Sequence, residues 1–537
     1  MSRQYTADEL NQMSARELSL IILAQQAQLQ TLNENMELLI EQIRIANQQR
    51  FGRKTEKLDQ IDGQLSLFDD AENLADPEIP EPTVEEVVSY KRKKQKGKRD
   101  SDLEGLPVES VPHILTNQEL DMYYGAGNWR RLPTETYKRL RYEPASWTVE
   151  LHSVDVCVGT GGDHQDEFLR GKRPKDLLKN SIVTPSLGAA ILNGKYVLAL
   201  PLYRIEQEFE RNGFRLSRQT MANWVISFSS YFRPMWRRMR ELLLELSVVQ
   251  SDETPTQVIR DGRPATSKSF MWVYRSGEYF KSRQIVLYEY QRTRHHDHPK
   301  AFLDGFHGIL MTDGLQQYHL LEKESEGITN ANCWAHARRD FADACKAMGK
   351  ANQQAMKQST AHKALELIAG IYRADETLSE LDPEERLKQR QIIVKPLVEA
   401  YFAWVREQLS SDGSLLKGKT MEGLNYSLNQ EKHLKVFLQD GNVPIDNSAA
   451  ERAIRPFCIG KKNWVLINSE KGAEASAIMY SIAESAKLNN LKPYMYFKHL
   501  LSVLPEHIDK DGNIDPSVLD TLMPWSKTLP EECYKRR

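Results

Sequence analysis

The sequence predicts a multidomain protein with an α/β or α+β core, and three observations lead to this prediction. The chain has 537 residues, which is too long for one ordinary hydrophobic core. Residues 246–345 alternate strand-like and helix-like segments. Residues 346–440 have an almost wholly helical pattern, rich in Ala, Leu, Gln, Lys and Glu.

The first 50 residues are predicted to form a coiled coil. Between Leu18 and Ile43, apolar residues recur at alternating spacings of three and four, as in a helix that packs against a second helix. The seam covers barely four heptads. One amphipathic helix that packs on its own protein therefore stays an alternative.

Residues 51–110 are predicted to form a linker, first acidic and then basic. Residues 68–86 include several prolines and eight acidic residues but no basic one. Seven of the nine residues at 91–99 are then Lys or Arg. Such a basic run suits contact with DNA phosphates, although a solvated tether explains it equally well.

A small β-rich module (111–175) and a helical region (176–245) are expected next. Strand-like pieces such as SWTVELHSVDVCVG and the Gly-containing turns GAGN and GTGGD predict the module. The helical region contains a helix, a turn at Gly213 and a second helix capped by Ser217, which is the layout of a helix-turn-helix. Its second helix would present three polar side chains from its first turns, where a recognition helix contacts bases: Arg218, Gln219 and Asn223. Helical hairpins also occur as plain scaffold, so both interpretations stay open.

The core is predicted in two parts, residues 246–345 and 441–505, on either side of the helical stretch 346–440. VVQSDETPTQV, SFMWVYRS and RQIVLYEYQ are expected as consecutive antiparallel strands with turns at Asp261-Gly262 and Ser276-Gly277. GILMTDG and ITNANCW predict two more strands. A Gly-Asn-Val-Pro break at 441–444 ends the helical stretch, and residues 506–537 are expected as a C-terminal tail.

Composition excludes several classes of protein. The formal charge of −2 gives no overall sign of a nucleic-acid partner, so any basic surface must be local. The five cysteines are scattered and form no CxxC pair, which argues against a disulfide framework and an obvious zinc site. No apolar run is long enough to span a bilayer, and the N-terminus lacks a signal peptide's apolar core. We therefore expect a cytoplasmic protein with no membrane partner.

Three acidic residues stand out by their context. Asp252 follows an apolar strand, Asp313 ends the strand GILMTD before Gly314, and Glu451 lies on a short helix that Pro456 is expected to end. Three converging carboxylates can hold two hard divalent cations and activate an attacking oxygen in phosphoryl transfer. Any one of these acids alone is more often a turn residue or a helix cap.

The surroundings of Glu451 strengthen this interpretation. Asn447, Glu451 and Arg455 follow at spacings of four, which places them on one helix face. A capped helix with an exposed Glu and Arg pair is the plain alternative. Beyond it, Lys461, Lys462 and Lys471 supply groups that can bind phosphate. From residue 452 to residue 498 there are eight Lys or Arg residues and three acids, so this segment is locally basic.

Several long motifs carry a resemblance to a known family. They are SDETPTQV, MTDGLQQY, NCWAHARRDF, DNSAAERAIRPFCIGKKNWVLINSEKGAEASA and, upstream, QRFGRKTEKLDQ and LPLYRIEQEFERNGFRLSRQTMANWV. Together they resemble the transposases of the insertion sequence 66 family. The match keeps the same order from about residue 20 to about residue 500.

This resemblance implies a DDE-type transposase with a ribonuclease H-like catalytic domain that a helical insertion interrupts. Asp252, Asp313 and Glu451 match the family's metal-binding acids, which would hold two Mg²⁺ or Mn²⁺ ions. The family pattern also contains supporting positions for DNA contact, strand geometry or the surroundings of the metal. They are Glu253, His336, Arg338, Arg339, Asn447, Arg452 and Arg455. For His336, a hydrogen-bonded core histidine is an equally good interpretation.

One departure from the family pattern concerns the β-rich module. Members of the family usually carry paired cysteines there, which form a zinc-binding segment. Here the region contains DMYYGAGNWRRLP and VDVCVGTGGDH, and Cys157 is its single cysteine. A closed zinc site needs four suitable ligands, so we expect no zinc in this module. The module's role in binding element ends is thereby put in doubt.

The function that follows from the resemblance is transposition of DNA. A water molecule would hydrolyse the phosphodiester at each element end, and the freed 3′ hydroxyl would then attack target DNA. The partners are double-stranded DNA, a second copy through the coiled coil, giving a homodimer or higher oligomer, and two small accessory proteins of the same element. Two rivals remain: a catalytically idle DNA-binding regulator and a structure-selective nuclease of the same fold.

Overall fold

The computed structural model describes residues 181–535 except 350–352 and 412–416, with a few shorter stretches and single positions before them. The predicted coiled coil (1–50) and linker (51–110) lie outside the described residues, apart from isolated positions. Of the predicted β-rich module, the structure describes one antiparallel hairpin of β1 (Val156–Val158) and β2 (Phe168–Arg170). This hairpin belongs to a different compact unit from residues 176–535.

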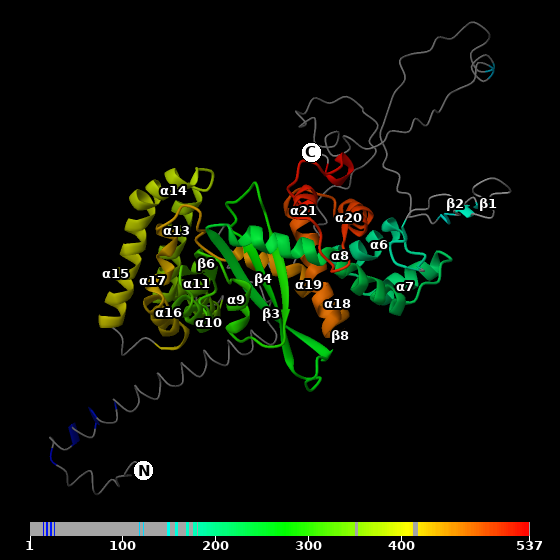
Figure 1. Ribbon diagram of the computed structural model, residues 1–537. Helices are drawn as coiled ribbons and strands as arrows, with labels where there is room; N and C mark the ends of the chain where they lie inside the picture. Colours follow the sequence, from blue (N-terminus) through cyan, green and yellow to red (C-terminus); the bar gives the residue numbers. More distant parts are fainter. Residues whose placement is uncertain are drawn as a thin grey trace. The chain divides into compact units, whose positions relative to one another are not determined.

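A mixed sheet forms the centre of the larger unit (Figure 1). Its strand order is β5-β4-β3-β6-β7, and β8 pairs with the far end of β3. β3 is antiparallel to β4 and parallel to β6, β4 is antiparallel to β5, and β6 is parallel to β7. The strands are β3 (Val248–Arg260), β4 (Lys268–Ser276), β5 (Val286–Gln291), β6 (Gly308–Thr312), β7 (Ile328–Asn332) and β8 (Ile467–Ser469). The three predicted antiparallel strands and the two further strands predicted at GILMTDG and ITNANCW are present, and the latter two pair in parallel.

Helices that come before the sheet in the sequence and helices that come after it share one hydrophobic core with the sheet. This core contains buried side chains such as Phe228, Phe232 and Met235 beside Tyr288 and Phe497. The helices are α6 (Pro185–Leu192), α7 (Leu202–Arg211), α8 (Arg218–Leu244), α19 (Glu470–Leu488), α20 (Pro493–His507) and α21 (Pro516–Leu522). The residues expected as a C-terminal tail also pack here: Leu519, Leu522 and Cys533 are buried in this core. Residues 176–245 therefore do not pack separately from the sheet.

The edge strand β5 is covered by α19. Ser481 Oγ accepts from Tyr288 N at 2.8 Å, and Ser485 Oγ accepts from Val286 N at 2.9 Å. Asn489 Nδ2 donates to Gln284 O at 2.7 Å in the same series. Ser481 and Ser485 are four residues apart on the helix, a rise of about 6 Å, and Tyr288 and Val286 are two residues apart on the strand, a rise of about 6.6 Å. Because these two distances are nearly equal, successive helix turns reach successive outward-facing backbone amides of β5. The helix thus bonds backbone groups that an edge strand would otherwise leave open to another chain.

The predicted helical insertion is helical, and it has a second hydrophobic core. Its buried side chains pack with Val248, Met311 and Ala331 of the sheet. Figure 1 shows these helices on one side of the sheet and α18 (Ser448–Trp464) to α21 on the other. The helices of the insertion are α12 (Gln353–Lys357), α13 (Thr360–Glu376), α14 (Pro383–Gln389), α15 (Lys395–Ser411), α16 (Gly418–Asn429) and α17 (Glu431–Leu434). α11 (Trp334–Met348) precedes the insertion and packs in the same core. Two short helices, α9 (Asp297–Phe302) and α10 (Gln316–Glu324), lie within the sheet's connections.

The predicted helix, turn and helix at α7 and α8 are present. Gly213 has a φ of +83°, a conformation that favours glycine, and it lies in the turn. Ser217 Oγ accepts from Thr220 N at 3.1 Å and so caps α8, as expected. α8 is 27 residues long and buries one face in the core, so it serves as scaffold over most of its length. No helix of the described chain is long and apolar enough to cross a membrane.

Candidate active site

Two of the three singled-out acids lie on neighbouring parallel strands. Asp252 lies within β3, opposite Val273 of β4, and Asp313 directly follows β6. β3 pairs with β6 in a register that places Gln250 opposite Met311. Two further residues along both strands bring Asp252 and Asp313 to the same level. β3 includes the whole of the predicted strand VVQSDETPTQV and continues to Arg260, so Asp252 lies inside the strand and not, as its place after the apolar run indicated, at its end.

Glu451 comes from the first turn of α18, which packs on β3 and β4. The predicted end of this helix at Pro456 was wrong, since α18 continues to Trp464. Proline removes a single backbone hydrogen bond within the helix. The packing beyond it offsets that loss: Phe457 is fully buried, and Gly460 lies so close to the Tyr480 hydroxyl that a Cβ would clash.

Asn447 holds the start of α18 against β3. Its Nδ2 donates to Ser251 O at 2.8 Å, and its Oδ1 accepts from Gln250 Nε2 at 3.3 Å. On the other side of the helix start, buried Arg275 of β4 donates to Ala449 O at 3.1 Å. These contacts fix the helix turn that carries Glu451 beside the residue that precedes Asp252. Arg275 was not recognised in the sequence, because its partner is a backbone carbonyl of a distant helix.

The three acids influence one another electrostatically. Burial raises the pKa of Asp252 well above its usual range, and the charges of Glu253, Glu451 and Asp313 raise it further. Burial and then Glu253 raise the pKa of Asp313 to about 6, although the Leu315 N–H, Arg294 and Arg339 oppose this shift. The three carboxylates do not all lie within 4.8 Å of one another, unlike two other groups in the described chain. They form a loose cluster of like charge.

Glu253 points to the other side of the sheet from Asp252, as alternation along a strand requires. Its side chain is 1% exposed and pairs with the guanidinium of Arg294 through Nε at 2.7 Å and through Nη2. Tyr318 Oη also donates to it at 2.6 Å. Glu253 is therefore a neutralised buried acid rather than a free ligand. The sequence did not identify Arg294 or Tyr318, which approach from other elements.

His336 lies beside Glu451, with 4.0 Å between its Nδ1 and Glu451 Oε1. Burial, and then the charge of Arg339, lower the pKa of His336 to about 3, so its ring is neutral at pH 7. Arg339 is exposed on the same helix turn, and Arg338 is half-buried. Arg452 pairs with Glu278 at 3.2 Å, and Arg455 Nε is buried without a hydrogen-bond partner among the described residues.

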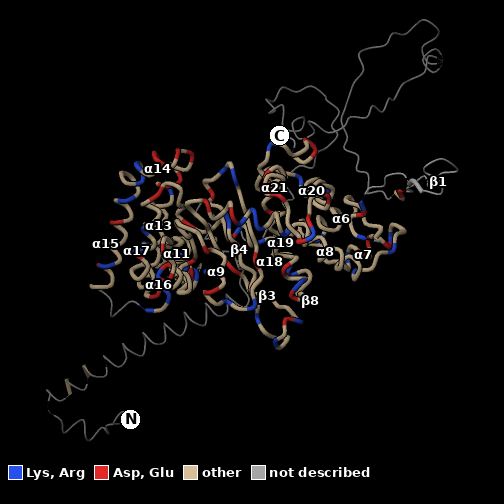
Figure 2. Tube along the Cα trace, viewed as in Figure 1, with Lys and Arg blue, Asp and Glu red and all other residues tan. Residues whose placement is uncertain are grey.

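Apart from Arg338 and Arg339 on α11, the predicted DNA-contacting residues lie at two places. The first place is the end of α18 and the start of α19. On α18, Lys461 Nζ donates to Pro255 O at 2.6 Å and Lys462 is exposed, and Lys471 on α19 is exposed as well. Figure 2 shows basic and acidic residues mixed along this part of the chain. The second place is the start of α8, where Arg218, Gln219 and Asn223 are all exposed, and Gln219 Nε2 donates to Asn223 Oδ1 at 3.1 Å.

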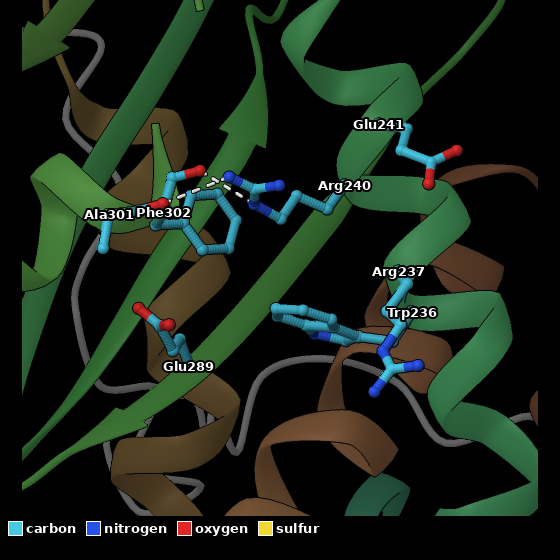
Figure 3. A pocket seen from close by; sticks show the side chains of 7 residues that line it. All are labelled: Trp236, Arg237, Arg240, Glu241, Glu289, Ala301 and Phe302. Atoms are coloured by element: carbon cyan, nitrogen blue, oxygen red, sulfur yellow. Dashed lines mark hydrogen bonds between the residues drawn. The ribbon is translucent and has the colours of Figure 1, made fainter. Parts of the chain in front are cut away.

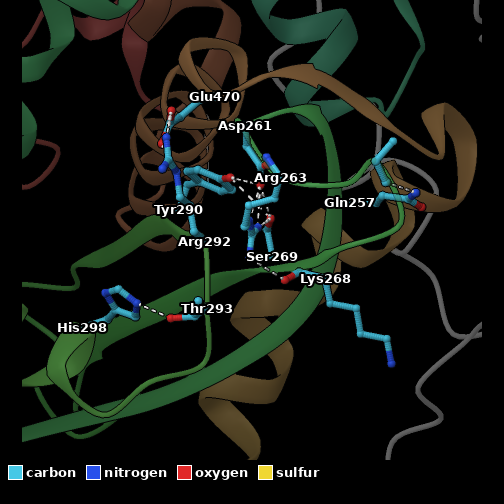
Figure 4. A network of polar contacts seen from close by, with 11 residues as sticks. Gln257, Asp261, Arg263, Lys268, Ser269, Tyr290, Arg292, Thr293, His298 and Glu470 are labelled. Carbon is cyan, nitrogen blue, oxygen red and sulfur yellow. Dashed lines mark hydrogen bonds and ion pairs between the residues drawn. The ribbon is translucent and has the colours of Figure 1, made fainter.

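A polar network fixes the hairpin between β3 and β4 (Figure 4). Asp261 is buried and accepts from Arg263 Nε at 3.1 Å and from Ser269 Oγ at 3.2 Å. Arg263 lowers the pKa of Asp261 to about 2. Arg292 pairs with Glu470 at 2.7 Å and so ties the end of β5 to the start of α19. The strand that carries Asp252 is thereby held at its far end as well.

A cavity of about 400 Å³ lies between α8, β5 and α9 (Figure 3). Arg240 lines it and donates to Phe302 O at 2.8 Å and to Ala301 O at 3.1 Å. Burial raises the pKa of Glu289, which also lines it, to about 7. None of the three acids lines this cavity, so it is distinct from their cluster.

Comparisons with known proteins point in one direction. The model described as Transposase IS66 family matches residues 180–475, and the model described as Transposase C of IS166 homeodomain matches residues 38–111. Two relatives from Sinorhizobium fredii are the uncharacterized proteins y4qI and y4jD. They are 28% identical over 372 residues and 26% identical over 373 residues, each covering 67% of this chain. The aligned part covers 66% of y4qI, just under two thirds, and 70% of y4jD.

Proposed function

The chain belongs to the Transposase IS66 family, and on this basis we propose that it is a DDE-type DNA transposase whose metal-binding acids are Asp252, Asp313 and Glu451. The proposal rests chiefly on the clustering of these three carboxylates from two strands and one helix. The charges of Asp313 and Glu451 both act on Asp252, although 138 residues separate these two acids in the chain.

The strand arrangement supports a ribonuclease H-like catalytic domain. Counted along the chain from β3, the sheet order is 3-2-1-4-5, with the second strand antiparallel to the first and the fourth parallel to it. In this proposal the first strand carries Asp252, the end of the fourth carries Asp313, and the helix after the insertion carries Glu451. The catalytic domain would then comprise residues 246–345 and 441–505, interrupted by residues 346–440.

The residues present fit a pair of Mg²⁺ or Mn²⁺ ions. The three ligands offer carboxylate oxygens only, which these hard cations prefer. Burial raises the pKa of Asp252, the charges of Glu253, Glu451 and Asp313 raise it further, and a bound cation would oppose these effects. The cluster is wider than one ion would need, and two ions in such sites lie about 3.5–4 Å apart. When bound, such ions lower the pKa of an attacking water and stabilise charge on the leaving oxygen.

The chain's own residues would position these acids and the DNA. Asn447 orients the helix turn that bears Glu451. Arg294 and Tyr318 engage the Glu253 carboxylate, so this carboxylate would not serve as a ligand of the cations. His336, neutral at pH 7, would limit the conformations of the Glu451 carboxylate. Arg339, whose charge reaches Asp313, would bind a phosphate that approaches the acids.

DNA binding outside the acid cluster would use several segments. Residues 38–111 match a homeodomain model, and this match includes the segment predicted as a linker, so we assign DNA contact to it. The exposed starts of α8 and α19, with Arg218, Gln219, Asn223 and Lys471, would add further contacts. A coiled coil in residues 1–50 would pair two copies, and two accessory proteins of the same element would complete the assembly in the cytoplasm.

Cleavage and joining of labelled element ends test the proposal. Wild type should cut and join these ends in Mg²⁺ or Mn²⁺, bind without turnover in Ca²⁺, and lose both steps in Asp313→Asn. Equal activity of the variant would refute the assignment of Asp313. If wild type bound DNA without a divalent cation and did not cleave it, a catalytically idle regulator would be favoured. If wild type cut the ends but did not join them, a structure-selective nuclease would be favoured.

A further inference from the structure

A second cluster of potential metal ligands lies where the helical insertion meets the sheet's connections. His319 and Glu322 lie one turn apart on α10, and His433 lies on α17 at the end of the insertion. One ligand atom from each lies within 4.8 Å of the other two. Glu322 Oε2 and His433 Nε2 are 2.8 Å apart, and the two imidazole rings have centroids 4.2 Å apart.

The two ring nitrogens of His319 make no hydrogen bond within the described chain, although a buried polar group normally has a hydrogen-bond partner. Both of its nitrogens are buried without a hydrogen-bond partner among the described residues. Gly314 and Gln430 lie near enough to affect its pKa, but neither is in hydrogen-bonding geometry with the ring. Imidazole nitrogens that no protein group engages are available to coordinate a metal ion.

The ligand types favour a different metal from the three acids of the sheet. Two imidazoles and one carboxylate suit Zn²⁺ and its neighbours Co²⁺ and Ni²⁺ better than Mg²⁺. Ligand atoms around a tetrahedral zinc ion are about 3.4 Å apart, given Zn–N and Zn–O distances of about 2.0–2.2 Å. The three ligand atoms lie within 4.8 Å of one another, so each separation would change by no more than about 1.4 Å to reach this distance.

We propose that His319, Glu322 and His433 bind one Zn²⁺-class ion. A cavity of about 500 Å³ adjoins these three residues and gives a fourth ligand position access to water. The same cavity is lined by Gln430, which accepts from Asn332 Nδ2 at 2.8 Å and so already links the insertion to β7.

The ion would fasten the insertion to the segment that carries Asp313. α10 begins three residues after Asp313, and α17 leads into the chain that starts α18. A metal bridge between α10 and α17 joins elements more than 100 residues apart in the chain, so it would stabilise the fold as a cross-link does. The site is independent of the proposed catalysis, since none of its ligands belongs to the cluster of three acids.

Zinc titration of the full-length protein, stripped with a chelator beforehand, tests the proposal. Calorimetry should show one tight Zn²⁺ site in wild type, and Co²⁺ should give the visible absorption of a low-coordinate site with nitrogen ligands. His433→Ala should weaken binding by at least about 10–100-fold. Glu322→Gln keeps the side-chain volume and should weaken it as well. Zn²⁺ should raise the melting temperature of wild type but of neither variant.

Two controls separate this site from others. The exposed group His295, His296 and Asp297 also has ligand atoms within 4.8 Å, so His295→Ala with His296→Ala should leave the tight site unchanged. Asp313→Asn should leave Zn²⁺ affinity unchanged while it abolishes DNA cleavage, which separates failure of this proposal from failure of the proposed function. A wild type that binds no zinc, or a folded Glu322→Gln variant that binds it with wild-type affinity, would overturn the proposal.

Discussion

Replacing Asp313 by asparagine should make the metal-free protein more stable at neutral pH. The pKa of this carboxyl is raised from 3.8 to about 6, mainly by burial and then by Glu253. Its folded-state pKa therefore exceeds its unfolded value, so the folded state binds the proton more tightly. The associated stability is complete below about pH 4 and is lost as the pH rises through 6.

The magnitude follows from the size of this shift. One pKa unit corresponds to about 1.4 kcal/mol, so ionised Asp313 lowers the free energy of unfolding by about 3 kcal/mol above pH 6. Asparagine removes the charge and keeps an oxygen that can accept from Leu315 N, as Asp313 Oδ1 does at 3.2 Å. It also removes one of the charges that raise the pKa of Asp252. Asp313→Asn should thus gain up to about 3 kcal/mol at pH 7.5.

Urea unfolding at pH 7.5 and at pH 4, in EDTA and in Mg²⁺, measures this gain. In EDTA, the variant should exceed wild type at pH 7.5, and the difference should shrink at pH 4. Saturating Mg²⁺ should stabilise wild type, by about 2.7 kcal/mol at 100 times its dissociation constant, and should leave the variant unchanged.

Asp509→Asn provides the matched control. Asp509 is exposed and accepts from the backbone N–H two residues later at 2.9 Å, as Asp313 does, but it lies outside the acid cluster. This variant should change stability by less than about 0.5 kcal/mol. If Asp313→Asn proved no more stable than wild type in EDTA at pH 7.5, the argument that burial and the charge of Glu253 make ionised Asp313 destabilising would be wrong.

Two further predictions concern residues that position the sheet and its helices. Asn447→Ala should lower the free energy of unfolding, measured in urea, by about 2–4 kcal/mol, because it leaves buried groups of β3 unpaired. The same variant should weaken Mg²⁺ binding about 10–100-fold. Asn513→Ala, at an exposed position, should have neither effect. Replacing Ser481 or Ser485 by alanine should lower the free energy of unfolding by about 1 kcal/mol each. Both variants should also speed hydrogen exchange at the β5 amide that the lost hydroxyl binds. The control Ser502→Ala, at an exposed position, should leave that exchange unchanged.

The sequence predicted those features of the fold that depend on local pattern. Apolar residues concentrate in the segments of β3, β4 and β5, and Gly262 and Gly277 mark the turns between them, so these strands could be found without any tertiary information. The cap at Ser217 and the turn at Gly213 are local in the same sense. Asp252 and Asp313 were found because acids beside apolar strands are conspicuous.

The features that were missed depend on partners far apart in the chain. Glu253 is buried because Arg294 neutralises it from 41 residues away, and no local pattern reveals that pairing. α18 continues beyond Pro456 because Phe457 packs into a core built from other helices. The segment after residue 506 was expected as a tail, yet Leu519 and Cys533 complete a core contributed by the rest of the chain. Tertiary packing overrode local preference in these cases.

The helical insertion does more than separate Asp313 from Glu451. Arg390, fully buried and paired with Asp375, donates to the carbonyls of Phe437, Asp440 and Val443 at 2.8–3.2 Å. Tyr372 Oη donates at 3.0 Å to Asp446 Oδ2, and Asp446 Oδ1 accepts from the N–H of the residue that begins α18. Side chains of the insertion therefore fix the segment from which α18 starts. Because Glu451 lies on the first turn of that helix, shortening the insertion would disorient this acid without removing any residue of the acid cluster.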